Sequence, residues 1–286
     1  MEEKVIHVEN VNFSYSKYAF IQDVSFDVKK GEIFGFLGPS GAGKSTLQKI
    51  LTGLISDYTG SSSILGVESK HHGNAFYEKI GVDFEFPSLY EKLTARENLK
   101  YFSSLYSGEK RDIDALLKEV GIYNHADKKV KDFSKGMKSR LNFIKALVHD
   151  PQVLFLDEPT SGLDPNNAKI MKDMIRKERD NGKTIIITTH NMQDATELCD
   201  RVAFIVDGKV KALDTPHNFI MSKGAVKVNY TYLKDGVECT NSSLLSNISE
   251  DKVLDNLIKT NQITSIHSAE PTLNDIFIEL TGALLC

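Results

Sequence analysis

The chain has 286 residues, 41% of them hydrophobic and 26% charged, so it can bury a substantial core, which excludes a disordered protein. Its formal net charge is −4 without a broad basic stripe, which argues against nucleic acid as a partner. Three widely spaced cysteines indicate a reducing compartment, and no apolar run approaches the ~18 residues of a membrane span, so we expect a soluble cytoplasmic chain.

The N-terminal part predicts strands that lead to a glycine-rich turn. Alternating residues over 5–15 and the run 24–28 indicate antiparallel strands, and residues 33–37 form a short apolar strand. A glycine-rich stretch follows at 38–43, and a helix after it. One face of that helix is predicted to carry Leu47, Ile50, Leu51 and Leu54.

Helical patterns replace strand patterns from about Pro87 to Asp150, which predicts an inserted helical subdomain. One helix is expected over 112–121, and another from about Ser134, with Leu141, Ile144 and Leu147 on one face. Buried parallel strands are then expected at 153–156, 184–187 and 202–206.

After Pro216 the chain becomes more polar, which predicts a small accessory α+β unit over 216–286 behind an α/β domain of residues 1–215. It keeps one alternating run, 226–232, and helical stretches near Val253 and Asn274.

The glycine-rich stretch carries the first chemical motif. Gly38-Pro39-Ser40-Gly41-Ala42-Gly43-Lys44-Ser45 fits G-x-x-x-x-G-K-S/T, in which backbone N–H groups surround phosphate oxygens at a helix N-terminus. Lys44 would reach the β- and γ-phosphates and Ser45 would bind Mg²⁺, with Thr46 completing the cofactor-binding segment. The alternative, a chance turn, fits poorly between a buried strand and an amphipathic helix.

An acidic pair at the end of the strand 153–156 forms the second chemical motif. Asp157 is expected to hold Mg²⁺ beside the phosphates, and Glu158 to act as general base toward the attacking water. Such a pair alone is often a solvated strand end, but with the phosphate loop it predicts ATP hydrolysis.

With Pro159-Thr160-Ser161-Gly162-Leu163-Asp164 and Thr188-Thr189-His190, residues 5–214 resemble the ABC (ATP-binding-cassette) ATPase family. The resemblance implies a RecA-like P-loop NTPase core with an antiparallel β subdomain. It also implies that Asp164 couples the two sites of a dimer and that His190 contacts the γ-phosphate.

Family members carry a Leu-Ser-Gly-Gly-Gln type signature that reaches the ATP of the opposite subunit, and this chain has Phe133-Ser134-Lys135-Gly136-Met137. Ser134 can cap the helix. Lys135 either adds a charge toward ATP or points into water, and both readings stay open.

Two further positions follow from the resemblance. Tyr15 matches the residue that stacks on adenine, with a buried strand tyrosine as the alternative. Glu85 stands where the family usually has glutamine, and its carboxylate is expected to approach Mg²⁺ and alter the site's metal demand. The adjacent His71 and His72 lack zinc-motif spacing and are expected in a surface loop.

The ending Glu270-Pro271-Thr272-Leu273-Asn274-Asp275-Ile276-Phe277 is similar to that of bacterial drug, peptide and lantibiotic exporter ATPases. An ordinary amphipathic helix packing through Leu273, Ile276, Phe277 and Leu280 is the alternative.

By resemblance, the partners are a second ATPase subunit and a transmembrane permease. The permease would dock on a groove lined by Leu89, Tyr90, Leu93 and Tyr101. An importer ATPase, a soluble ABC ATPase acting on ribosomes or DNA, and a regulator without turnover are the rival functions. The last would lack Glu158 or His190, and both are present.

Overall fold

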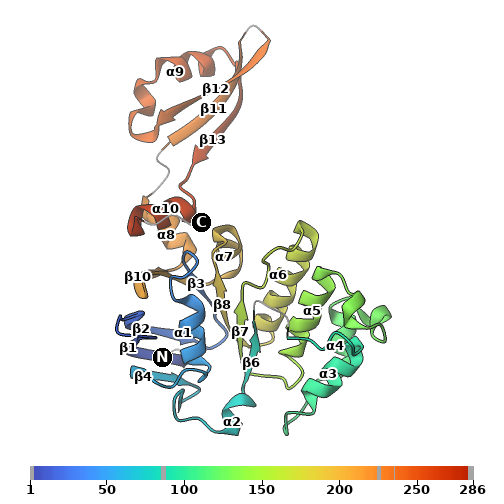
Figure 1. Ribbon diagram of the computed structural model, residues 1–286. Coiled ribbons are helices and arrows are strands. Elements are labelled where there is room, and N and C mark those ends of the chain that lie inside the picture. Colours follow the sequence, from blue (N-terminus) through green and yellow to red (C-terminus); the bar gives the residue numbers. More distant parts are fainter. Residues whose placement is uncertain (1–2, 85–87, 224–226, 235, 283–286) are drawn as a thin grey trace. The chain divides into compact units, whose positions relative to one another are not determined.

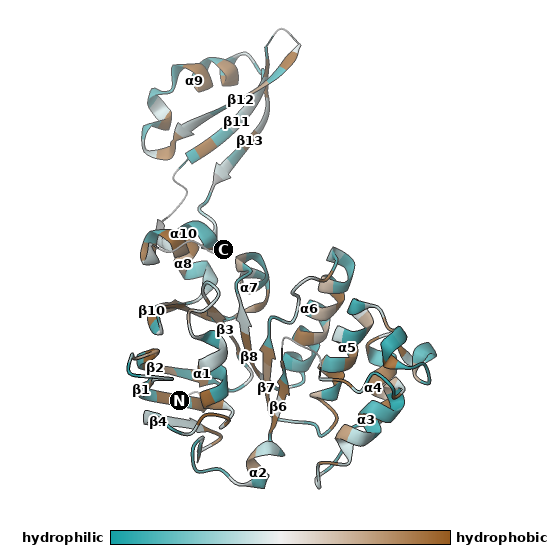
Figure 2. Cartoon of the chain, in the orientation of Figure 1, coloured by the Kyte–Doolittle hydropathy of each residue, from teal (hydrophilic) through white to brown (hydrophobic). Residues whose placement is uncertain are grey.

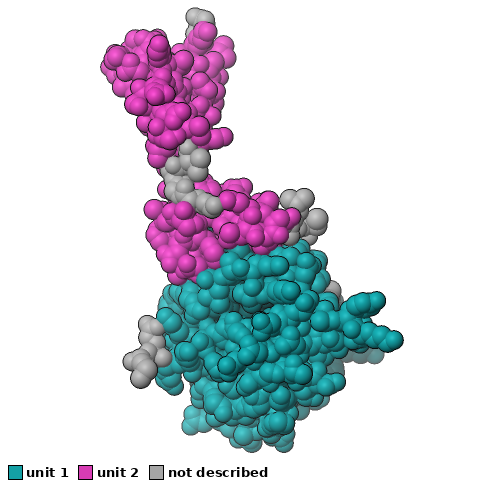
Figure 3. All heavy atoms as spheres, turned by 90° about the vertical axis from the view of Figure 1, so that its left-hand side faces the viewer, with its two compact units in different colours: residues 1–213, 283–286 teal, residues 214–282 magenta. Residues whose placement is uncertain are grey.

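The computed structural model describes residues 3–84, 88–223, 227–234 and 236–282. The chain divides into two compact units, one reaching Leu213 and the other spanning Asp214–Gly282 (Figure 3). Each unit is described by itself below. Among the described residues, no helix combines the length and the apolar character needed to cross a membrane.

The first unit begins with an antiparallel sheet of strand order β2-β1-β4-β5. Strands β1 (Lys4–Phe13) and β2 (Ile21–Lys29) pair antiparallel as expected, and β1 also pairs with β4 (Thr59–Ile64), which pairs with β5 (Val67–Glu68). Alternate residues of β1 and β2 are buried because one face of the sheet covers the core while the other meets solvent.

A second sheet forms the centre of the unit, with the order β10-β9-β3-β8-β7-β6 in the described part of the chain. Its members are β3 (Ile33–Leu37), β6 (Ile80–Asp83), β7 (Val153–Asp157), β8 (Thr184–Thr189), β9 (Arg201–Val206) and β10 (Lys209–Asp214). Strands β6, β7, β8, β3 and β9 run parallel to their neighbours and are largely buried, which explains their apolar composition (Figure 2).

Helices lie against this sheet and beside β6 (Figure 1). They are α1 (Lys44–Leu51), α2 (Asn74–Tyr77), α3 (Ala95–Ser103), α4 (Ile113–Glu119), α5 (Lys135–Lys145), α6 (Pro165–Asp180) and α7 (Met192–Leu198), with 3₁₀ turns at Tyr123–His125 and Val130–Asp132. Helices α3, α4 and α5 contact one another, and we refer to them as the helical subdomain.

Side-chain caps explain where several helices begin. Thr94 and Glu97 form a capping box on α3, and the side chains of Asp112, Ser134 and Asp164 accept backbone N–H groups of α4, α5 and α6. One prediction was wrong: Leu54 is exposed and lies outside α1. Helix α1 ends at Leu51 because Gly53 has a positive φ of 73°, which terminates the helix.

The second unit contains a three-stranded antiparallel sheet of order β12-β11-β13. Its elements are α8 (Pro216–Lys223), β11 (Lys227–Lys234), β12 (Val237–Leu244), a 3₁₀ turn at Leu245–Glu250, α9 (Lys252–Lys259), β13 (Ile263–Ala269) and α10 (Leu273–Thr281). A small core joins Tyr230 to Leu254 and Leu257.

The sequence revealed β11 but neither of its neighbours. Strand β12 is largely exposed and polar, so no hydrophobic alternation marks it. In α10 the residues Leu273, Ile276 and Phe277 are buried as expected, whereas Leu280 is 47% exposed, one turn beyond that buried face.

Candidate functional site

The phosphate loop connects β3 to α1 through a backbone that only glycine permits at two points. A Cβ on Gly38 would lie 2.1 Å from the carbonyl oxygen of Ile205, so the loop passes β9 too closely for any side chain. Gly43 precedes α1 with a φ of 108°, a left-handed conformation that L side chains rarely adopt. The loop therefore turns tightly and directs the first N–H groups of α1 toward its own concavity.

Lys44 bends back over this loop. Its side chain is 7% exposed, and Nζ donates to the carbonyl oxygens of Gly38, at 2.7 Å, and Pro39, at 3.0 Å. Ser45 follows in the first turn of α1 and is exposed. The loop thus presents a cation, a hydroxyl and helix N–H groups together, which suits a polyphosphate with a hard metal ion.

The parallel register brings three chain segments to one edge of the sheet. Leu37, the last residue of β3, pairs with Thr189 of β8, and Asp157, the last residue of β7, pairs with Thr188. We call these strand ends, with the residues that follow each, the carboxyl edge. The phosphate loop, the acidic pair and His190 therefore leave the sheet at the same level, where open α/β sheets bind ligands.

Asp157 and Glu158 have different partners on β8. Asp157 accepts a hydrogen bond from the hydroxyl of Thr188. Glu158 has a left-handed backbone with a φ of 51°, which is uncommon for a residue with a long side chain, and its N–H donates to the carbonyl oxygen of Thr188 at 2.9 Å. This conformation turns the Glu158 side chain out of the strand direction.

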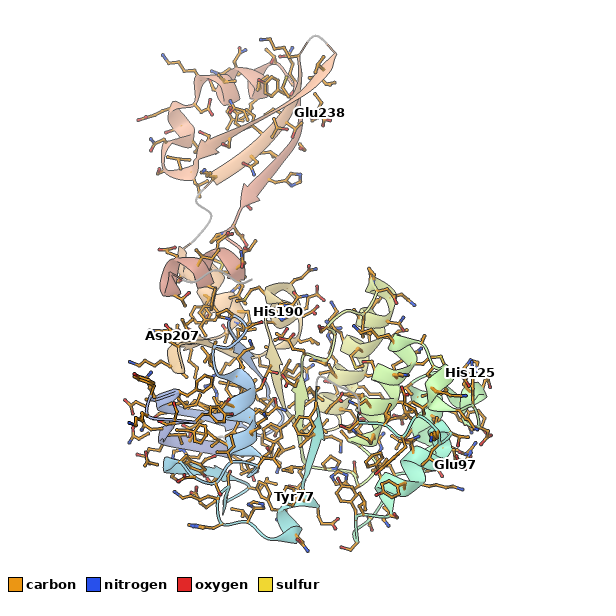
Figure 4. All side chains as sticks on the ribbon, viewed as in Figure 1. Tyr77, Glu97, His125, His190, Asp207 and Glu238 are labelled. Carbon is orange, nitrogen blue, oxygen red and sulfur yellow. The ribbon has the colours of Figure 1, made fainter. Side chains whose placement is uncertain are left out.

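The carboxylate of Glu158 joins His190. Glu158 Oε1 lies 2.7 Å from Nδ1 of His190 and accepts the backbone N–H of His190 at 3.1 Å. Glu158 Oε2 accepts the hydroxyl of Thr189 at 3.2 Å. His190 itself is exposed at the carboxyl edge (Figure 4). The two residues assigned to catalysis beside Lys44 are therefore in direct contact.

Tyr15 lies beyond the end of β1 and is 60% exposed, so the alternative of a buried strand tyrosine was wrong. Its hydroxyl is 3.0 Å from Oγ1 of Thr46, and its ring meets the rings of Phe13 and Phe20 edge to face. The contact with Thr46 places an exposed aromatic ring next to the phosphate loop.

Residues 134–137 lie at the start of α5, where the Ser134 hydroxyl accepts the N–H of Met137 at 3.2 Å. Lys135 is exposed, and its Nζ lies 2.0 Å from the point where a Cβ on Gly162 would stand. A Cβ added to Gly136 would likewise lie only 2.7 Å from Cγ of Asn167. The sequence did not reveal these contacts between the start of α5 and the chain around Asp164.

Asp164 caps α6 and is held in place by its neighbours. Its carboxylate accepts the backbone N–H groups of Asn166 and Asn167 and the side-chain amide of Asn167. The Asn167 amide, followed by the backbone donors, holds the pKa of Asp164 below its usual range. Asp164 is thus an exposed, ionised carboxylate at a helix start.

A cavity of about 290 Å³ adjoins the carboxyl edge on the side of α5. Its lining includes Lys135, Asn142, Asp157, Glu158 and Ser161. No sequence motif includes Asn142, which is polar in an otherwise apolar face of α5. The same is true of Asp83, which follows three residues of an apolar strand.

Two expectations concern metals. Glu85 lies outside the described residues. His72 bonds to the carbonyl oxygen of Ser69 and the hydroxyl of Tyr77, and the described residues contain no group of three or more His, Cys, Asp or Glu arranged to hold a metal ion. Ser45 and Asp157 instead offer the oxygen ligands that Mg²⁺ prefers beside phosphates.

Known proteins are similar to this chain over most of its length. A family model described as "ABC transporter" matches residues 21–161. A fluoroquinolone export ATP-binding protein of Mycobacterium tuberculosis is 44% identical over 99% of this chain and 95% of its own length. The Nod factor export ATP-binding protein I of Rhizobium meliloti is 36% identical over 97% of this chain and 88% of its own length.

Solved structures give the same result. The protein cbiO1 of Clostridium perfringens, part of the ABC transporter complex cbiONQ, is 27% identical with a TM-score of 0.70 over 79% of this chain and 94% of that one. A further ATP-binding subunit of an ABC transporter is 28% identical with a TM-score of 0.69, over 77% and 93%. The predicted α/β P-loop fold is confirmed.

Proposed function

The chain belongs to the family of ABC transporter ATP-binding subunits and hydrolyses ATP, and from this premise we propose that it drives export through a separate membrane permease. The observation that carries the site assignment is the bonded pair Glu158 and His190 at the same sheet edge as the phosphate loop. The names of its relatives, which are export ATP-binding proteins, support the direction of transport.

The proposed roles of the residues are consistent with their positions. Lys44 and the N–H groups of α1 bind the phosphates, while Ser45 and Asp157 hold Mg²⁺, which when bound neutralises charge developing on the phosphoryl oxygens. Glu158 accepts the proton of the attacking water, and the contact from His190 fixes the orientation of its carboxylate. Tyr15 stacks on the adenine ring.

The second half of each site comes from another subunit in this proposal. Ser134 to Met137 at the exposed start of α5, together with Asp164, would reach the ATP held by the partner's phosphate loop. The N-terminal end of α5 attracts anions, and Lys135 adds a positive charge near it. Closing two subunits over two Mg·ATP then provides the motion transmitted to the permease.

The docking surface for the permease is proposed from the helical subdomain. Tyr90 and Tyr101 are exposed, and their rings meet edge to face with 5.0 Å between centroids. The backbone N–H of Tyr90 also donates to the buried Asn98 side chain of α3, which anchors the backbone of this surface.

Transport in inverted membrane vesicles tests the function. Vesicles containing this subunit and its permease should accumulate a fluorescent fluoroquinolone when ATP is supplied, because inverted vesicles expose the subunit outside and reverse export into uptake. The same vesicles with Glu158→Gln subunit should not. ATP-driven loss of preloaded compound would instead indicate an importer, and ATPase activity stimulated by ribosomes or DNA would favour the soluble alternative.

A further inference from the structure

A buried polar contact joins the sheet to the helical subdomain. Asp83 ends β6 and is 6% exposed, while Asn142 lies within α5 and is 2% exposed. The side-chain amide of Asn142 donates to the carboxylate of Asp83 and, at 3.3 Å, to the carbonyl oxygen of Phe84. Both groups have given up water for this contact, which costs free energy that an apolar pair would not.

A cation lies near this pair. Lys145 is one turn further along α5, and its ammonium lies over the ring of Phe102 of α3, 5.1 Å from the centroid. Burial raises the pKa of Asp83 and lowers the pKa of Lys145, in each case against the attraction between them. Stability therefore does not explain why Asp83, Asn142 and Lys145 are polar, since apolar residues of similar volume often stabilise a fold as well or better.

The two ends of the contact lead to different parts of the proposed site. Asp83 pairs with Leu156 across β6 and β7, directly before Asp157 and Glu158. Asn142 is two helical turns beyond Ser134, the cap of α5, and lines the same cavity as Glu158. A rigid link between Asp83 and Asn142 therefore fixes the start of α5 relative to the carboxyl edge.

We propose that Asp83 and Asn142 are positioning residues that hold the Ser134 end of α5 in register with Glu158, so that one subunit aligns both of its contributions to a shared pair of ATP sites. This inference rests on the function proposed above for Ser134 and Glu158. The phosphate loop joins β3 to α1, and β7 and β8 separate β3 from β6, so we expect ATP binding to be independent of the pair.

The central experiment removes both polar groups together. Asp83→Val with Asn142→Ala removes both partners of the contact together, a change that is often nearly neutral for stability. The Phe84 carbonyl oxygen loses one donor and Lys145 loses a neighbouring carboxylate. We expect an unchanged KM for ATP and only a small drop in the unfolding temperature. We expect kcat to fall by roughly 10²-fold, the effect of about 1 Å of misplacement at a catalytic site. A double variant that folds and keeps the wild-type kcat overturns the proposal.

A matched control removes another buried polar pair from the same unit. Ser62 and Ser69 lie in the antiparallel region with their hydroxyl oxygens 3.1 Å apart. Replacing both by alanine deletes a buried side-chain contact far in sequence from α5, and kcat should stay at the wild-type value. An equal loss of kcat in this control would show that any buried polar pair has the same effect, which also overturns the proposal.

A swapped pair covers the case in which the apolar variant does not fold. Asp83→Asn with Asn142→Asp exchanges donor and acceptor within the pair and keeps the volume, so kcat should stay near the wild-type value. A crystal structure of the swapped variant shows whether the contact still forms. If it does and kcat is nevertheless roughly 10²-fold below the wild-type value, a positioning role is contradicted. Failure of the proposed function itself looks different, since wild-type chain and Glu158→Gln would then hydrolyse ATP at the same rate.

Discussion

Different kinds of contact stabilise the carboxyl edge of the first unit and the interior of the small second unit. At the edge, positions are fixed by backbone approach and by polar contacts, such as Gly38 against Ile205 and Glu158 against His190. The second unit is held by a small core around Tyr230, Leu254 and Leu257. We therefore expect activity at the edge to be sensitive to small changes in individual contacts. We expect the stability of the second unit to depend on the apolar volume that it buries.

The largest effect on turnover is expected at Glu158. Glu158→Gln removes the proton acceptor while keeping size and most contacts, so the ATPase rate should fall by about 10²–10⁴-fold with ATP binding retained. A phosphate-release assay and size-exclusion chromatography with Mg·ATP measure turnover and trapped dimer. Glu9→Gln, at an exposed carboxylate of β1, is the control. Undiminished turnover would remove Glu158 from the role of base.

Lys44→Ala should weaken ATP binding as well as turnover. The change deletes a charged hydrogen-bond donor to the phosphates, so affinity should drop by about 1.5–3 kcal/mol, whereas backbone N–H contacts persist. Calorimetric titration measures the affinity for ATP. Lys49→Ala, on the exposed side of α1, should bind as the wild type does. Equal affinities for both variants would contradict the phosphate-loop assignment.

A smaller effect tests whether backbone approach controls the edge. Gly38→Ala introduces a Cβ 2.1 Å from a backbone carbonyl oxygen, so the loop must move, and stability should fall by about 1–3 kcal/mol together with ATP affinity. At Gly73 an added Cβ would have nothing within 4 Å, and φ is negative, so Gly73→Ala serves as control. Denaturant unfolding compares the two, and indistinguishable midpoints would refute the close approach.

The smallest effect on ATP turnover is expected from the second unit. Leu254→Ala should destabilise that unit by about 2–5 kcal/mol, because a leucine leaves a cavity in a small core. ATPase activity of the isolated subunit should remain unchanged. Hydrogen exchange resolves the two units separately, and Val253→Ala, at an exposed neighbour, is the comparison. A parallel loss of ATPase activity would show that the units are energetically inseparable.

Much of the fold and of the nucleotide site could be predicted from local patterns. The phosphate loop is recognisable because its function lies in the backbone, and only certain residues permit that backbone, as at Gly38 and Gly43. The central strands are recognisable because burial on both faces favours apolar residues throughout, as in β3. Sequence by itself thus determined the parallel core, the loop and the acidic pair that follows β7.

Only the tertiary structure decided which distant side chains meet. Asp83 and Asn142 are 59 residues apart, and Lys135 lies against Gly162 through the packing of two helix starts. Strand β12 was missed because an exposed, polar edge strand has no hydrophobic period and exists through its pairing with β11. Such contacts depend on the register of sheets and helices, which no short stretch of sequence contains, and they decide how the start of α5 faces Glu158.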